Sequence, residues 1–252
     1  MEGKDRIAFI TGANRGIGLE TARRLGKLGI TVLLGSRDLS KGEAAASALR
    51  QDGAKNVEAV QFDVANYEDH TRIADLLEKR FGRLDILVNN AGIALDSGNY
   101  GAPGGFNTTS TVSQKVLHET FETNFFGAVS LTRTLLPLLK RSLAGRIVNL
   151  SSILGSLTMQ SDPASPVYNF KAFAYDTSKT ALNAFTIHLA AELRNTPIKV
   201  NSAHPGWVKT DMGGPTAPLD VAEGAKTSVE LATLPENGPT GSYFHLGKRL
   251  PW

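Results

Sequence analysis

The chain has 252 residues, of which 20% are charged and 41% belong to the hydrophobic set, and its formal net charge is +3. This balance is typical of a folded protein with a sizeable core and excludes a disordered chain. Because the basic residues are scattered without a Lys/Arg-rich run, the sequence gives little support for binding to nucleic acid or to a membrane surface.

Two residue types limit the chemistry further. The sequence contains no cysteine, which excludes disulfides, thiolate metal sites and a cysteine nucleophile. Its five histidines show no close spacing of the kind that metal sites use, so we expect no metal. Neither a secretory leader nor an apolar run of about 18 residues is recognisable, so we expect a cytoplasmic protein with no membrane partner.

Seven short apolar segments rich in Ile, Val and Leu have the length and composition of buried strands. They lie at residues 6–10, 31–35, 57–61, 84–88, 146–150, 198–203 and 242–246. Between most of them apolar residues recur at helical spacing, as at Ile73, Leu76 and Leu77. This alternation predicts an α/β fold, namely a doubly wound (Rossmann-type) seven-stranded parallel sheet with helices on both faces. No linker or repeat divides the chain, so we expect one domain over residues 1–252.

A glycine-rich turn, Thr11 to Gly18, directly follows the first predicted strand and opens a helix that ends near Gly29. Glycines let the backbone approach a pyrophosphate, and the free amides and dipole of a helix start attract its charge. An ordinary strand-to-helix turn also needs small residues, but the preceding strand and following helix favour a dinucleotide site. The expected cofactor contacts at this turn are Gly12, Asn14, Arg15, Gly16, Ile17 and Gly18.

The residues after the second predicted strand bear on which dinucleotide binds. An acidic residue here holds the ribose of NAD, whereas this chain has Arg37, which is able to grip a 2′-phosphate bidentately. Arg15 in the glycine turn supplies a second positive charge. Together they predict NADPH/NADP as the cofactor, although both arginines also fit a solvated surface and the nearby Asp38 keeps that alternative open.

Three long segments rich in Gly, Pro and Ser follow the fourth, fifth and sixth predicted strands, at residues 93–111, 153–174 and 206–219. They should crowd one edge of the sheet, and we expect substrate lids rather than disordered insertions. Several apolar side chains in this region either line a substrate pocket or pack in the core. They are Met159, Phe170, Phe173 and Trp207.

Tyr175 and Lys179 lie four residues apart in the sequence Tyr-Asp-Thr-Ser-Lys, and on a helix they would occupy one face. An ammonium group beside a phenol favours the phenolate, so we expect the pKa of Tyr175 to be lowered from about 10 and the phenol to exchange protons near neutral pH. A surface anchor beside a solvated lysine is the alternative.

With the glycine turn and this pair in place, the chain resembles the short-chain dehydrogenase/reductase family along nearly its whole length. Thr11 to Gly18 matches the family's cofactor turn, and further matches follow in the family's order. The resemblance implies cofactor contacts at Asp63, Val64, Asn90, Ala91, Gly92, Pro205, Gly206, Val208 and Thr210, besides Tyr175 and Lys179. Taken singly, several of these are also ordinary cap or turn residues, as Asp63 and Asn90 illustrate.

The resemblance also implies four catalytic residues, Asn124, Ser152, Tyr175 and Lys179. In the family Ser152 would hold the carbonyl oxygen, Tyr175 would deliver the proton, Lys179 would bind the nicotinamide ribose and make the acid stronger, and Asn124 would hold a relay water. Asn124 lies in a predicted helical stretch, residues 112–140, where a satisfied core amide is the alternative. Ser151 and Ser152 are also plausible turn formers.

Within the family, the chain looks most like the NADPH-dependent carbonyl reductases. Its ending, Gly238 to Trp252, is similar to theirs, and the 23 positions from Ser152 to Tyr175 exceed the interval in most members. The resemblance implies reduction of an aldehyde, ketone or quinone, with a monomer weakly favoured over a homodimer. An alcohol or steroid dehydrogenase running in the oxidative direction and a non-catalytic NADP-sensing module are the alternatives. No nucleic-acid partner is expected.

Overall fold

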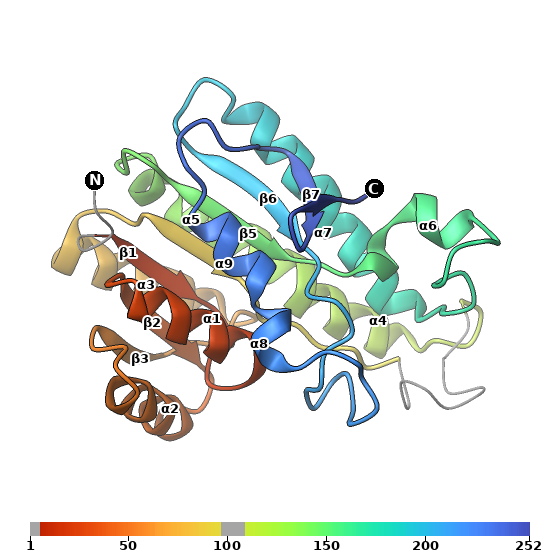
Figure 1. Ribbon diagram of the computed structural model, residues 1–252, viewed down its shortest axis with the longest axis horizontal. Coiled ribbons are helices and arrows are strands. Elements are labelled where there is room, and N and C mark those ends of the chain that lie inside the picture. The colour runs from red at the N-terminus through yellow and green to blue at the C-terminus, as the bar shows by residue number, and fades with distance from the viewer. Residues whose placement is uncertain (1–5, 97–108) are drawn as a thin grey trace.

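A central eight-stranded sheet organises the part of the chain that the computed structural model describes, residues 6–96 and 109–252. The strand order is β3-β2-β1-β4-β5-β6-β7-β8 (Figure 1). The strands are β1 (Ile7–Ile10), β2 (Thr31–Ser36), β3 (Val57–Gln61), β4 (Ile86–Asn89), β5 (Arg146–Leu150), β6 (Lys199–Ala203), β7 (Ser242–His245) and β8 (Lys248–Arg249). The seven predicted strands are confirmed, with boundaries that shift by at most two residues.

The sheet is doubly wound, as predicted. β1 pairs in parallel with both β2 and β4, and every pairing from β3 to β7 is parallel. The chain therefore builds outward from β1 in one direction and from β4 in the other. In such sheets a crevice opens where the order reverses, outside the carboxyl ends of the strands. Here that place lies beyond the ends of β1 and β4.

The predicted count of seven strands was one too low. β8 pairs antiparallel with β7, joining His245 to Lys248 across a two-residue turn. Both turn residues, Leu246 at φ 47° and Gly247 at φ 74°, lie in the left-handed region that such a hairpin requires. Leu is an unusual residue for that conformation, so the sequence lacks the Asn-Gly or Asp-Gly signal by which a hairpin is recognised.

Helices cover both faces of the sheet. One face packs against α1 (Gly16–Lys27), α2 (Leu39–Gln51) and α9 (Lys226–Ala232), and the short α8 (Val221–Gly224) contacts α1. The other packs against α3 (Tyr67–Phe81), α5 (Gly127–Leu139) and α7 (Phe173–Glu192), and α4 (Gln114–Phe121) contacts α7 (Figure 1). Within the described residues, no helix combines the length and apolarity needed to cross a bilayer.

Alternating side chains of the strands divide the core into two layers. Phe9 of β1 and Leu33 of β2 join the cluster under α3, α5 and α7, whereas Ile10 and Leu34 join the cluster under α1, α2 and α9. All four are fully buried. Because consecutive residues of a strand point to opposite faces, a strand buried on both sides has to be apolar throughout, which is why these segments read as continuous hydrophobic runs.

Two predicted segments differ from the structure in detail. The helical stretch predicted at residues 112–140 is divided by a π-helical turn, η2 (Glu122–Phe126), between α4 and α5. The segment at 153–174, predicted to be irregular, contains the 3-10 turn η3 (Ile153–Gly155), the helix α6 (Leu157–Ser161) and the start of α7. Ser152 and Ser156 cap η3 and α6 by accepting from backbone amides, so short capping side chains order this segment. Residues 97–108 of the other predicted lid, 93–111, lie outside the described residues.

A buried arginine joins three chain segments at the edge of the sheet where β5 begins. Arg146, at the start of β5, is 1% exposed. Its guanidinium donates to the carbonyl oxygens of Gly145, Pro197, Leu234 and Pro235 at 2.7–3.2 Å. It thereby joins β5 to the chain segments that precede β6 and follow α9, and carbonyl groups that are buried there obtain a donor.

Arg146→Met should lower the free energy of unfolding by roughly 2–5 kcal/mol, because it keeps much of the side-chain volume but leaves buried carbonyls without donors. Urea denaturation measures the change. Arg133→Met is the matched control, since Arg133 is exposed on α5, and it should shift stability by no more than about 0.5 kcal/mol. Equal stability of the two variants would show that the hydrogen bonds of Arg146 do not stabilise the fold.

Candidate active site

A cleft of about 790 Å³ lies at the carboxyl edge of the sheet, lined by residues that follow β1, β2, β3, β4, β5 and β6. The structure brings every predicted cofactor residue to its wall. These are Gly12, Asn14, Arg15, Gly16, Ile17, Gly18, Arg37, Asp63, Val64, Asn90, Ala91, Gly92, Tyr175, Lys179, Pro205, Gly206, Val208 and Thr210. Ser152 lines the cleft as well, whereas Asn124 lies behind the wall.

The glycine turn is shaped by contacts that leave no room for side chains. Gly12 and Gly16 adopt left-handed backbone angles, φ 60° and 57°. A Cβ on Gly18 would lie 2.5 Å from Nδ2, the side-chain amide nitrogen of Asn90. That amide donates to the carbonyl oxygens of Thr11 (2.8 Å) and Gly12 (3.0 Å), tying the loop after β4 to the turn after β1. α1 begins at this turn without a capping side chain, so its first amides are available to an anion.

The end of β2 presents two cations to the cleft. Arg37 is exposed, and Lys41 lies in the first turn of α2, where sequence reasoning had not singled it out. Asp38, which had left the choice of cofactor open, serves as the N-cap of α2. Its carboxylate accepts from Ser40 Oγ (2.6 Å) and the amide of Lys41 (3.2 Å). Because its carboxylate already accepts these two hydrogen bonds, Asp38 is less available to bind a ribose hydroxyl, and this end of the cleft favours a phosphate.

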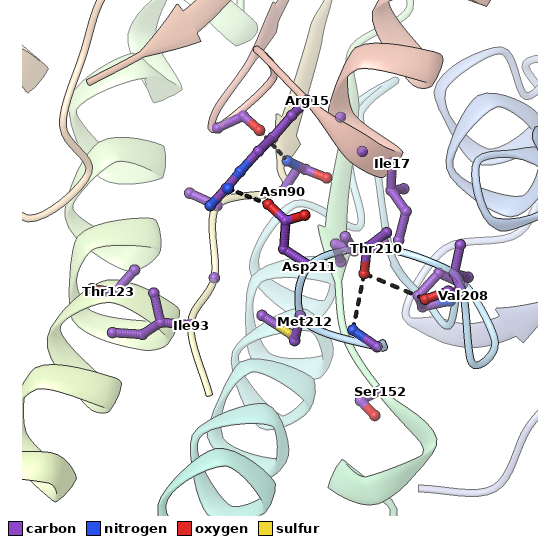
Figure 2. Close-up of a pocket in the computed structure, with 18 of the residues that line it drawn as sticks. Arg15, Ile17, Asn90, Ile93, Thr123, Ser152, Val208, Thr210, Asp211 and Met212 are labelled. Carbon is purple, nitrogen blue, oxygen red and sulfur yellow. Dashed lines mark hydrogen bonds and ion pairs between the residues drawn. The ribbon is translucent and has the colours of Figure 1, made fainter. Parts of the chain in front are cut away.

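Arg15 lies at the cleft wall, where it forms an ion pair, and its role as a cofactor contact stays a prediction. Figure 2 shows its side chain reaching from the glycine turn to Asp211, in the loop after β6, with which it forms an ion pair. The contact joins two walls of the cleft that are almost 200 residues apart in the sequence. Lys41, whose Nζ lies 3.6 Å from Asp38 Oδ2, is a further cation of the cleft wall besides Arg15 and Arg37. Thr210, next to Asp211, accepts from the amide of Gly213 at 3.1 Å and shapes the same loop.

Ser152, Tyr175 and Lys179 meet where β5 ends against α7. Ser152 follows β5 and Tyr175 lies in the first turn of α7, with Lys179 one turn later, as the four-residue spacing predicts. The hydroxyl of Ser152 interacts with the phenol of Tyr175 and lowers its pKa. All three side chains are at least nine-tenths buried. The cleft thus holds a hydroxyl, a phenol and an ammonium group away from bulk water.

The predicted direction of the Tyr175 pKa was wrong. Burial raises the pKa of this phenol to about 12, a net value that includes a lowering contribution from Ser152 and smaller raising contributions from the charges of Asp176 and Asp96. Lys179 Nζ lies 5.6 Å from the centre of the phenol ring. Residue spacing predicts that proximity, but it does not reveal that both groups leave water, which penalises the charged form of each.

Lys179 itself is held by backbone. Its Nζ donates to the carbonyl oxygen of Leu150 at 2.8 Å, and burial lowers its pKa to about 8. A Cβ built on Gly92 would lie 3.4 Å from Lys179 Nζ and 3.4 Å from Asn124 Oδ1. The glycine after β4 therefore occupies the space between the ammonium group and the amide, and brings three predicted site residues together.

Asn124 is buried in the π-helical turn with its side chain fully engaged. Its Oδ1 accepts from the amide of Ile93 (2.8 Å), and its Nδ2 donates to the carbonyl of Ile93 (2.8 Å) and to Ser178 Oγ (3.0 Å). This is the satisfied amide that we had considered as the alternative. It fixes the loop after β4 to α7, and the predicted role in holding a relay water stays a prediction.

Two carboxyl groups, those of Asp96 and Asp176, accept hydrogen bonds from backbone amides at the start of α7. Asp96 is fully buried and accepts from the amides of Ala174 (2.6 Å) and Tyr175 (3.3 Å). Asp176 Oδ2 accepts from the amide of Ala172, while its buried Oδ1 has no partner in the described part of the chain. Burial raises the pKa of Asp176 to about 8, with a further contribution from the charge of Asp96.

Comparison with known proteins agrees with this geometry. A family model described as short chain dehydrogenase matches residues 6–218. The chain belongs to the short-chain dehydrogenase family. Carbonyl reductase (NADPH) 1 of Homo sapiens is 33% identical, with 98% of each chain covered. A (+)-neomenthol dehydrogenase of Capsicum annuum is 32% identical, with 95% of each covered. The crystal structure of an NADPH-bound carbonyl reductase from chicken fatty liver has a TM-score of 0.82 at 30% identity and covers 99% of this chain and 100% of its own.

The substrate end of this short-chain dehydrogenase has mainly apolar walls. Phe170 and Trp207, which the sequence had suggested, line the cleft, whereas Met159 and Phe173 do not. Lining residues that sequence reasoning missed here are Ile93, Leu154, Val167, His204 and Met212. They come from the loops after β4, β5 and β6, whose side-chain directions have no periodic signal in the sequence.

Asp176 should make the protein less stable as pH rises. Its carboxyl is protonated in the folded protein up to about pH 8 but ionises at about 3.8 when unfolded, so the free energy of unfolding should fall between these values, by up to about 1.4 kcal/mol per pH unit. Asp176→Asn should remove this part of the slope, as measured by urea unfolding across that range. Asp75→Asn, at an exposed position of α3, should leave the slope as in the wild type. A slope unchanged in the Asp176 variant would refute the buried proton.

Proposed function

We propose that this protein reduces the carbonyl group of a small aldehyde, ketone or quinone to an alcohol with NADPH, with Tyr175 as the general acid. The observation that carries the proposal is the Tyr175 phenol at the cleft wall, which interacts with Ser152 and whose pKa is raised by burial. Reduction needs a proton donor at the carbonyl oxygen, whereas alcohol oxidation needs a phenolate base. A phenol that keeps its proton through neutral pH therefore supports reduction over the oxidative alternative.

The protein is an NADPH-dependent oxidoreductase. Its family membership and the full-length similarity to NADPH carbonyl reductases support this conclusion. The residues of the cleft fit the cofactor. The glycine turn leaves open backbone amides at the start of α1, and Arg37 and Lys41 offer two positive charges to a 2′-phosphate. When bound, NADPH supplies the hydride.

Side chains of the protein position the substrate carbonyl and supply a proton to it. The hydroxyl of Ser152 and the phenol of Tyr175 form a pair of donors toward which a carbonyl oxygen is drawn. As negative charge grows on that oxygen, both hydrogen bonds strengthen, and the phenol proton passes to it. Lys179, within reach of the phenol ring, stabilises the phenolate that remains. An apolar wall excludes water and strengthens each of these interactions.

A non-catalytic sensor of NADP explains less of the structure. Holding a lysine ammonium at 4% exposure is unfavourable, and within the described residues its hydrogen-bond acceptor is a single carbonyl oxygen. A protein that only bound the dinucleotide would have no use for a buried acid at the substrate end. We therefore place Ser152, Tyr175 and Lys179 in the chemistry and Asn124 in the support of Lys179.

Tyr175→Phe should lower kcat/KM for carbonyl reduction by roughly 10²–10⁴-fold, because it removes the proton donor while keeping the ring. NADPH oxidation, followed by its absorbance, measures the loss, and NADPH fluorescence should show binding within about twofold of wild type. Tyr168→Phe, at an exposed position of the loop before α7, is the control and should keep full activity. Retained turnover in the Tyr175 variant would exclude it as the acid.

Arg37→Asp should weaken NADPH binding by roughly ten- to a hundredfold and leave NADH binding nearly unchanged, because a carboxylate replaces a charge-assisted donor to the 2′-phosphate. Fluorescence titration with both dinucleotides gives the ratio of dissociation constants. Arg133→Asp introduces the same charge change on α5, away from the cleft, and should not alter the ratio. The phosphate assignment fails if the Arg37 variant keeps the wild-type ratio.

A further inference from the structure

His204 is a polar group in the apolar part of the cleft that the chemistry above does not use. It directly follows β6, is 8% exposed and belongs to the lining of the cleft. Its Nδ1 accepts a hydrogen bond from the amide of Ile153 at 3.2 Å. Because a nitrogen that accepts from an amide carries no proton, the neutral ring has to carry its proton on Nε2.

The ring is held neutral and in one orientation. The ring of His245 lies tilted beside it with ring centres 4.8 Å apart, and His245 donates from its Nδ1 to the carbonyl of His204 at 2.9 Å. Burial, and secondarily the charge of His245, lowers the pKa of His204 to about 3. At neutral pH the residue therefore offers one N–H group, at Nε2, while the one ring hydrogen bond of His204 within the described residues is made by Nδ1.

The position of this donor relative to the reacting group follows from the chain. Ile153, whose amide binds Nδ1, is the residue directly after Ser152, and Ser152 interacts with the phenol of Tyr175. Nε2 is the other ring nitrogen, so the bond to Ile153 leaves it unoccupied. The cleft that His204 lines also includes the apolar side chains of Leu154, Phe170 and Trp207.

We propose that His204 is a specificity residue whose Nε2–H binds a second, neutral oxygen beside the reacting carbonyl, and that the preferred substrates are vicinal diketones. The inference rests on the proposed function and names the substrate class within it. One carbonyl receives the hydride of NADPH and the proton of Tyr175, while the second keeps its double bond, so the product is an α-hydroxy ketone. A neutral imidazole favours a neutral acceptor, since the ring itself carries no charge to compensate a buried carboxylate.

Two substitutions separate the donor from the rest of the ring. Asn at position 204 retains an oxygen that is able to accept from the amide of Ile153, but its side chain is too short to reach the position of Nε2. Gln places an amide N–H near the position of Nε2 instead. His188→Asn, at an exposed position of α7, is the matched control for the chemical change.

The test compares kcat/KM for diacetyl and for butanone, which differ by one oxygen, by following NADPH oxidation. His204→Asn should lower the ratio of the two values by roughly three- to tenfold, the worth of one neutral hydrogen bond, and His204→Gln should retain most of the wild-type ratio. His188→Asn should keep that ratio. NADPH binding by each variant confirms that it is folded.

The inference is overturned if His204→Asn and His204→Gln lower the ratio equally, or if both leave it within about twofold of wild type. In the first case the ring would matter only for packing, and in the second it would not contact the substrate. Absence of NADPH oxidation with every carbonyl compound would overturn the proposed function itself, and this inference with it. Reduction of butanone by the wild type therefore distinguishes the two failures.

Discussion

The burial of one cation, the ammonium group of Lys179, is the constraint on which the site depends. Such a group is stable away from water only if polar atoms surround it, and here the carbonyl oxygen of Leu150 lies 2.8 Å away. That bond requires the carboxyl end of β5 to lie against α7. The residue after β4, Gly92, lies against the same group, since a Cβ built there would be 3.4 Å from the ammonium nitrogen. One buried charge thus links the ends of β4 and β5 to α7.

The same burial determines the resting state of the chemistry. It shifts the pKa of Tyr175 upward and that of Lys179 downward, so both groups move toward their neutral forms. A phenol that is neutral at rest gains more from hydrogen bonds and a nearby cation as charge develops on a reacting oxygen than one that is already ionised. In this arrangement the hydroxyl of Ser152 and the ammonium group stabilise the phenolate mainly after the proton has left. The site therefore stabilises the charge that develops during the reaction more than it stabilises the resting state.

The sequence was sufficient for the sheet and for the residues that meet at the cleft, because each lies at a strand end or at a fixed helical spacing, and parallel strands bring their carboxyl ends to one edge. It was insufficient for whatever depends on burial or on loop direction. The spacing of Tyr175 and Lys179 predicts that they meet but not that desolvation reverses the expected pKa shift. The ion pair of Arg15 with Asp211 and the tautomer of His204 depend on contacts between distant loops, which have no periodic pattern.

The cofactor end of the cleft was more predictable from the sequence than the substrate end. At the cofactor end, backbone amides, glycines and a few charged residues form the wall, and their identity is prescribed by close approach to a common ligand. At the substrate end, the wall consists of side chains from the loops after β4, β5 and β6, where many residues satisfy the same packing requirement. A change of one side chain there, such as the one at position 204, alters which oxygen of a substrate finds a donor without moving the sheet. Relatives that share the reaction are therefore expected to differ in substrate mainly through these loops.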